Sequence, residues 1–413
     1  MPARRGGLWA HRDFMRLWGA QAVSSFGARI AREGLPMAAV ISLGAGPAAL
    51  GVFAAVTLAA QAALGLFAGA LADRLPRRAL LIVADLARAA VLTAMPAAAL
   101  LGGRPSLLEI YAAGALMGVF NVVFDVADHA FLPELIAADE LADGNSKLAA
   151  TDAVAEVGGP ALAGALFQLA SPPLALAVNA ATYLASALML SRISLRRPPV
   201  APEAKTAPLR LDLGGGLGLV LAHPLVRPLW ISEIAKSFFG CFFAALYIIF
   251  AIDVLKLTPG MLGLTIAMGG VGGFAGAALA PRMARALGPG PTILLAGAAG
   301  AAMLFLIPLA AGPPLVGMAF LAIAQLLGDG LQTVAQITAA TLRQSVLPAG
   351  QLGRAAGAFA SAGALGGVLG ALAGGALGAA IGPRETLLIA SAGIFAASAL
   401  LALTPLRTAR KAA

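Results

Sequence analysis

The chain has 413 residues, of which 60% are hydrophobic and 11% are charged, and its formal net charge is +9. Soluble domains are about 45–50% apolar and about 25% charged, so this composition excludes an ordinary soluble protein. Segments such as 38–72 and 286–328 contain no Asp, Glu, Lys or Arg. They exceed the roughly 20 apolar residues that a membrane-spanning helix needs. The sequence therefore predicts an all-α, polytopic membrane protein.

Apolar runs and the breaks between them predict twelve transmembrane helices. The first six cover residues 14–43, 48–72, 79–101, 107–132, 147–170 and 174–192. A polar, proline-rich stretch at 193–223 follows them. Six more helices cover residues 225–252, 260–281, 291–311, 315–342, 352–380 and 386–406. Proline pairs at 172–173 and 313–314 mark helix ends. We therefore expect an N-terminal six-helix bundle at 1–192, a cytoplasmic linker at 193–224 and a C-terminal six-helix bundle at 225–413.

Short matches recur at an offset of half the chain. Gly-Leu-Phe-Ala-Gly at 65–69 corresponds to Gly-Gly-Phe-Ala-Gly at 272–276, and Leu-Trp at 17–18 corresponds to Leu-Trp at 229–230. Pro-Ala-Ala-Leu-Gly at 47–51 corresponds to Pro-Gly-Met-Leu-Gly at 259–263. These ordered matches predict that the two bundles are pseudo-symmetric copies of one six-helix unit.

The positive charge is explained by membrane orientation. With both termini in the cytoplasm, 21 of the 28 Lys and Arg residues fall on the cytoplasmic side, three fall outside and four lie within helices. This bias follows the positive-inside rule and argues against nucleic-acid binding. The basic, polar segment 1–13 lacks the features of a cleaved signal peptide. We expect a monomer in a plasma membrane, of the bacterial inner-membrane type.

The sequence gives no indication of an enzyme or a metalloprotein. Its one cysteine, Cys241, lies in an apolar stretch, and His11, His129 and His223 are too far apart in the sequence to suggest a metal site. No set of nucleophile and base stands out either. We therefore expect no catalytic residues, no metal and no cofactor.

The loop between the second and third predicted helices has a glycine, an acid four residues later and then a cluster of arginines. It reads Gly69-Ala70-Leu71-Ala72-Asp73-Arg74-Leu75-Pro76-Arg77-Arg78. This pattern resembles the signature loop of the major facilitator superfamily, with which the twelve helices and the six-plus-six repeat agree. Segments at 14–18, 24–27, 132–135 and 342–354 are similar to the drug and siderophore exporter branch of that superfamily.

In the superfamily this loop holds the two halves together on the cytoplasmic side. The resemblance assigns this cytoplasmic gate to Gly69, Asp73, Arg74, Arg77, Arg78, Asp125, Asp128 and Arg354. Asp73 would accept from the N–H groups at the start of the eleventh helix, since a helix N-terminus favours negative charge. Arg77 and Arg78 would bridge to acids of the fourth helix. The alternative is that these arginines only set orientation.

The fifth predicted helix contains Gly158-Gly159-Pro160-Ala161-Leu162-Ala163-Gly164. Gly159, Pro160 and Gly164 match the glycine-rich exporter motif of the superfamily, and small residues occupy other positions where that motif has glycine. The motif implies close helix packing and export. Ordinary packing of small residues is the alternative.

Three predicted helices carry polar faces at one-turn spacing, and a charged group in the membrane is costly enough to suggest function. The resemblance implies that these helices line a central cavity. Proton-coupling candidates are Glu33, Asp329 and Glu233; substrate-cavity candidates are Gln21, Ser25, Arg29, Arg32, Lys236, Gln325 and Gln332. Ion pairs of Arg29 or Arg32 with Glu33, and of Glu233 with Lys236, are the structural alternative.

These features predict a secondary active transporter that works by alternating access, with proton-coupled export of small amphipathic molecules such as drugs or siderophore-like compounds. Its partners would be the lipid bilayer, the small-molecule substrate and protons. An uptake permease or a lysophospholipid flippase of the same fold is the alternative within transport. A non-transporting membrane scaffold or sensor is the alternative outside it.

Overall fold

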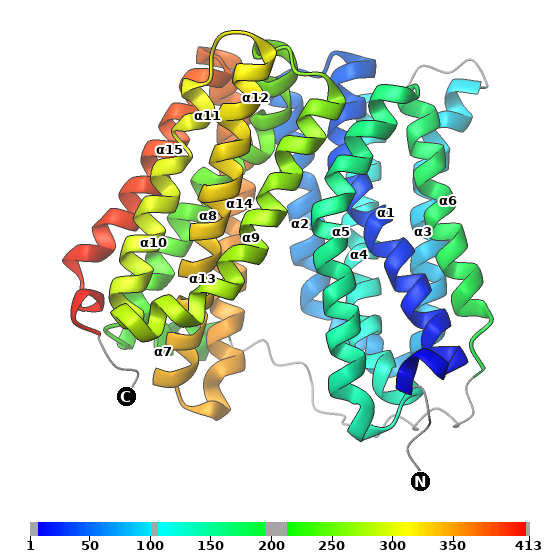
Figure 1. Ribbon diagram of the computed structural model, residues 1–413, viewed down its shortest axis with the longest axis horizontal. Coiled ribbons are helices and arrows are strands. Elements are labelled where there is room, and N and C mark those ends of the chain that lie inside the picture. The colour runs from blue at the N-terminus through cyan, green and yellow to red at the C-terminus, as the bar shows by residue number, and fades with distance from the viewer. Residues whose placement is uncertain (1–6, 101–105, 195–212, 410–413) are drawn as a thin grey trace. The chain divides into compact units, whose positions relative to one another are not determined.

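The computed structural model describes the backbone of residues 7–100, 106–194 and 213–409, with side chains throughout except at 66–74, 98–100, 213–215 and 349. Over these residues the chain is helical and has no strand, which confirms the predicted fold class (Figure 1). The first half contains η1 (Gly7–Ala10), α1 (Arg12–Leu43), α2 (Pro47–Arg74), α3 (Arg77–Leu100), α4 (Leu107–Leu135), η2 (Ala138–Glu140), α5 (Leu141–Leu169) and α6 (Pro172–Ser191).

The second half contains interrupted helices as well as continuous ones. They are α7 (Leu213–Ala222), α8 (Val226–Ile249) with the π-helical turn η3 (Phe250–Val254), α9 (Pro259–Leu287), α10 (Pro289–Met303), α11 (Leu306–Leu309), α12 (Pro314–Ile323), the π-helical turn η4 (Ala324–Asp329), α13 (Gly330–Val346), η5 (Ala349–Gln351), α14 (Leu352–Ile381), α15 (Pro383–Ala399), η6 (Leu400–Leu403) and η7 (Pro405–Thr408). The tenth predicted helix therefore corresponds to α12, η4 and α13, which follow one another without a break and have the π turn at their centre.

Local capping chemistry fixes where several helices begin and end. The Ser106 hydroxyl accepts from the Glu109 N–H, while Glu109 accepts in return from the Ser106 N–H at 2.8 Å, which starts α4. α1 ends because Gly44 adopts φ 60°, a left-handed conformation that glycine enters at little cost. Prolines in the first turn of α6, α9 and α15 fit the position where a missing N–H is harmless.

Ten helical stretches among the described residues are long and apolar enough to cross a membrane, judged by length and composition. α1 and α5 are not among them, because polar and charged residues interrupt their apolar sequence. These two helices pack against each other and pair their polar groups, as described below.

The chain forms two compact units. Unit 1 comprises Met1–Gly44 and Ala59–Arg210, and unit 2 comprises Ala45–Leu58 and Leu211–Ala413. In unit 1, α1 packs on α5 and α6, and α3 packs on α4 and α6. The corresponding pairs recur in unit 2, where α8 packs on α14 and α15, and α10 packs on α13 and α15. This recurrence agrees with the internal repeat in the sequence.

The predicted linker lies only partly within the described residues. Residues 195–212 are outside them, and the following segment forms α7, which packs on α14 in unit 2. Gly216 of α7 lies against the backbone carbonyl of Arg354, and Val220 is fully buried. This part of the predicted linker is thus a helix of unit 2, because its apolar side chains join that unit's core.

Candidate functional site

A cavity of about 1170 Å³ opens within unit 2 between α8, α13 and α14. Its polar lining consists of four charged side chains and of five hydroxyls and amides from α8 and α13. They are Glu233, Lys236, Asp329 and Arg343, and Ser232, Ser237, Gln332, Gln336 and Gln344. Alanines and Phe359 of α14 form much of the apolar wall. The structure therefore brings the predicted polar faces of the seventh and tenth helices together around one space.

Asp329 lies at the end of the π turn η4, where one extra residue in the turn changes the direction of the side chains. Its carboxylate and the Gln325 amide oxygen both approach Gly269 of α9 so closely that a Cβ there would overlap them. Gln325 is not part of the cavity lining, whereas Asp329 and Gln332 are. Gly269 thus provides the space that Asp329 occupies.

The charged groups of the unit 2 cavity are not paired with one another. Among the described residues, Glu233, Lys236 and Asp329 form no ion pair, so the alternative of a Glu233–Lys236 pair is not observed. The Lys236 ammonium lies 3.8 Å from the position that a Cβ on Gly297 of α10 would take. The Arg343 guanidinium lies over the Phe359 ring, 4.1 Å from its centre.

In unit 1, the polar face of α1 is bound to acids of α4 and α5. Gln21 donates to Asp128 of α4, and Ser25 donates to Asp152 of α5 at 2.6 Å. Arg29 donates to Glu156 of α5, one turn beyond Asp152. The contacts therefore follow one another turn by turn along α1, first to α4 and then to α5.

The two arginines of α1 are both held by carboxylates. Arg32 donates to Glu156 at 2.8 Å and to Glu33 at 2.8 Å, so the predicted structural pair of Arg32 with Glu33 is present. Arg29 pairs with Glu156 and not with Glu33. Sequence reasoning assigned Arg29 and Arg32 to the substrate cavity and did not connect them with Glu156. The spacing of four between Asp152 and Glu156 places both acids on one helical face.

The arginines after α2 make contacts other than the predicted ones. Arg77 pairs with Glu134 at 2.9 Å and donates to the Ala130 carbonyl at 2.8 Å; within the described part of the chain neither it nor Arg78 pairs with Asp125 or Asp128. The reason is position, since Glu134 lies nearer the end of α4 and Asp128 is held by Gln21 of α1. The expected bridge from Arg77 and Arg78 to Asp125 and Asp128 was therefore wrong: Arg77 pairs with Glu134, and Arg78 binds backbone carbonyls.

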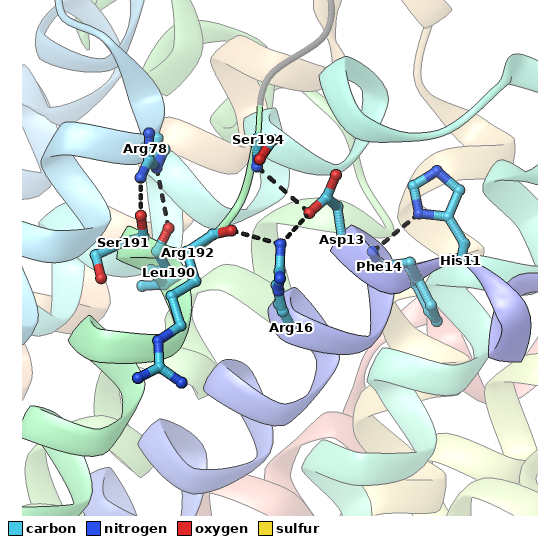
Figure 2. A network of polar contacts seen from close by, with 9 residues as sticks. All are labelled: His11, Asp13, Phe14, Arg16, Arg78, Leu190, Ser191, Arg192 and Ser194. Carbon is cyan, nitrogen blue, oxygen red and sulfur yellow. Dashed lines mark hydrogen bonds and ion pairs between the residues drawn. The ribbon is translucent and has the colours of Figure 1, made fainter.

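Arg78 instead caps the end of α6, as Figure 2 shows. It donates to the carbonyls of Leu190, at 2.9 Å, and Ser191, which are among the carbonyls a helix C-terminus leaves unpaired. Arg16 of α1 joins this end by bridging Asp13, at 2.9 Å, and the Arg192 carbonyl. The start of the chain segment after α6 is therefore fixed to α1 and α3.

The structure describes the side chains of only some of the remaining predicted gate residues. Gly69, Asp73 and Arg74 lie outside the described side chains. Asp125 is exposed on α4, and its carbonyl contacts His129 Nδ1 at 2.7 Å. Arg354 lies in the first turn of α14. The gate itself therefore stays a prediction.

The predicted packing motif of α5 lies against α1. A Cβ on Gly159 would overlap the Arg29 side chain, and Pro160 and Gly164 are buried within the helix. Gly159 thus permits the approach that brings Arg29 to Glu156.

Arg343 is a site residue that sequence reasoning did not assign to the cavity. It follows Asp329, Gln332 and Gln336 at intervals of three, four and seven residues, which keeps it on the same helical face. This heptad spacing is the signal that would have identified it.

Residues 17–371 match the family model described as Major Facilitator Superfamily. No curated protein matches the chain. Among solved structures, the nucleoside transporter NupG is 12% identical, with 95% of this chain and 98% of that chain covered and a TM-score of 0.72. A bacterial homologue of the iron transporter ferroportin is 19% identical, with 94% and 98% covered and a TM-score of 0.72. A bacterial homolog of the human lysosomal transporter Spinster is 15% identical, with 98% of each chain covered and a TM-score of 0.71.

Proposed function

The chain belongs to the major facilitator superfamily, and we propose that it is a secondary active transporter that exports small amphipathic molecules in exchange for protons. The family and the solved transporters of the same fold indicate a membrane transporter rather than an enzyme. What we propose beyond the family is the class of substrate, the direction of transport and the coupling of transport to protons. The observation that carries it is the charged cavity of unit 2.

That cavity holds ionisable groups that form no close ion pair among the described residues, although Glu233 interacts with Lys236 and Arg343 at longer range. A charge inside the membrane is costly, so such groups are rarely kept unless they pair or act on a solute. Glu233, Lys236 and Asp329 line the same space and form no ion pair among the described residues. We infer that the carboxylates of Asp329 and Glu233 exchange protons and that Lys236 contacts polar groups of the substrate. Phe359 and the alanines of α14 would contact its apolar part.

The polar face of unit 1 supports a third proton-coupling group. Glu33 and Glu156 share the Arg32 guanidinium, each at 2.8 Å. A proton on Glu33 would remove its charge and leave Arg32 with Glu156 alone. We therefore retain Glu33 as a proton-coupling candidate, and we revise the role of Arg29 and Arg32 from direct substrate contacts to groups that position these acids.

Export is the direction we propose, because the α5 motif with Gly159 and Pro160 is similar to the motif of exporters in this superfamily. The distribution of Lys and Arg supports cytoplasmic termini. A bacterial inner membrane is part of the proposal. We also propose that the protein works by alternating access and that it does so as a monomer.

A growth assay tests this proposal first. A bacterial strain that overproduces the chain is exposed to a panel of amphipathic compounds, and the same strain producing Asp329→Asn at equal membrane abundance is the control. We expect raised tolerance to at least one compound with the wild-type chain only. Increased sensitivity would indicate uptake, and an unchanged panel would contradict export of this class.

A further inference from the structure

Unit 1 contains a buried polar cluster that neither the gate nor the polar face of α1 uses. Asp85 and Arg88 of α3 are 0% and 2% exposed, and they form an ion pair. Ser24 of α1 donates to Asp85 Oδ1 at 3.1 Å and accepts from Arg88 at 3.1 Å. Arg88 also donates to the Asn121 side-chain oxygen of α4 at 3.1 Å. Three helices therefore contribute to one hydrogen-bonded group.

A fourth helix, α6, closes this cluster with a polar face of its own. Asn179, Tyr183 and Ser186 are each 0% exposed and are spaced four and three residues apart. The Arg88 guanidinium lies over the Tyr183 ring, 4.5 Å from its centre, which places this face beside the ion pair. The other ring next to Arg88 is Phe124, at 4.2 Å.

Five atoms of this cluster are buried without a hydrogen-bond partner among the described residues. They are Asp85 Oδ2, Arg88 Nε, Asn179 Nδ2, Tyr183 Oη and Ser186 Oγ. In the described part of the chain, every buried side-chain polar atom without a partner belongs to this cluster. Ser186 with Asp85 and Arg88 with Tyr183 interact only outside the geometry of a full hydrogen bond. An unpaired buried polar atom costs about 1–3 kcal/mol, so five in one cluster favour a ligand that pairs them.

The mixture of these atoms selects the chemistry of that ligand. Arg88 Nε and Asn179 Nδ2 can only donate, Asp85 Oδ2 only accepts when ionised, and the two hydroxyls do both. A cation would face the Arg88 guanidinium, an anion would face the Asp85 carboxylate, and an apolar molecule would pair none of these atoms. Small neutral molecules that both donate and accept fit these atoms. Because Asn179 and Ser186 lie seven residues apart on α6, about 10 Å at 1.5 Å per residue, more than one such molecule is needed.

We propose that this cluster is a binding site for water inside unit 1, between α1, α3, α4 and α6. Buried waters of this kind typically make about three hydrogen bonds to polar groups that lack other partners. These waters link the Asp85–Arg88 pair of α3 to the polar face of α6 and so join the two helices through hydrogen bonds. The site does not depend on the proposed transport function.

Radiolytic hydroxyl labelling of the purified full chain, read by mass spectrometry, tests the site. Radicals formed from bound water modify the side chains beside it, so we expect Tyr183 to be labelled several-fold faster than Tyr247. Tyr247 is the matched control because it is also buried and its hydroxyl contacts Thr265 at 3.4 Å. Labelling of Tyr183 no faster than that of Tyr247 would overturn the proposal.

A variant makes the test specific to the cluster. Asn179→Leu removes one donor and fills space, so it should lower Tyr183 labelling several-fold and leave Tyr247 labelling unchanged. Ser186→Ala serves as the milder variant if increased Tyr247 labelling shows that Asn179→Leu does not fold. In a folded variant, Tyr183 labelling equal to that of wild type would count against bound water.

Discussion

Glu156 of α5 accepts from Arg32 of α1 at 2.8 Å, and the same carboxylate also binds Arg29. One acid therefore holds both arginines of the α1 polar face. This contact ties together α1 and α5, whose composition alone does not qualify them as membrane spans.

Glu156→Gln should weaken the packing of α1 on α5. The side chains are partly exposed, so each pair contributes at most about 1 kcal/mol, and we expect a fall of a few degrees in Tm. Thermal unfolding of the purified chain in detergent measures this. Asp143→Asn is the control, since it removes the pair with Lys147 within one turn of the same helix. Equal Tm changes in both variants would contradict a special role for Glu156.

Gly269→Ala should displace the Asp329 carboxylate, because the added Cβ would overlap it. We expect reduced transport with normal membrane abundance. Gly273→Ala lies one turn along α9, where the Cβ would be 3.5 Å from the Thr333 hydroxyl, an ordinary contact. Gly273→Ala should transport like wild type; equal loss in both variants would show general damage to α9.

Arg77→Gln and Glu134→Gln should not be additive in their effect on Tm, because the two side chains pair at 2.9 Å. A double-mutant cycle measures the coupling. The matched cycle combines Arg77→Gln with Asp128→Asn, which we expect to be additive. Coupling of Arg77 to Asp128 instead would restore the partner that the sequence suggested.

Gly159→Ala should destabilise unit 1 by about 1–3 kcal/mol, the usual cost of overpacking a tight contact. The reason is that the Cβ would overlap Arg29 of α1. Gly357→Ala is the control, since a Cβ there meets nothing within 4 Å. A Tm for Gly159→Ala at or above that of Gly357→Ala would contradict close packing at this point.

The fold was largely predictable because membrane helices are specified by long apolar runs and by breaks such as Pro172 and Pro314. What the pattern did not predict is the π turn η4, since one extra residue in a turn leaves no mark on hydropathy. Helical spacing predicted that Gln325, Asp329 and Gln332 lie on one face. Because the π turn changes that spacing, Asp329 and Gln332 line the cavity and Gln325 does not. The α7 helix was missed because it is short and follows a polar segment.

The candidate site was predictable only as separate faces of single helices. One-turn spacing identified Glu233, Lys236 and Asp329, which one cavity then brought together. Contacts between helices could not be inferred from a single sequence. Arg77 pairs with Glu134 instead of Asp128, and Arg29 pairs with Glu156, because helix packing determines which acids lie within reach.

Flux driven by an imposed pH gradient tests the central claim most directly. The chain is reconstituted in vesicles with a compound identified by the tolerance panel, and uptake is followed with wild type, Asp329→Asn and Asp253→Asn. Asp253 is the matched acid, since it is exposed in the other π turn, η3, and does not line the cavity. We predict that Asp329→Asn abolishes pH-driven flux while Asp253→Asn retains it. Wild-type flux in Asp329→Asn would contradict a role for this cavity in proton-coupled transport.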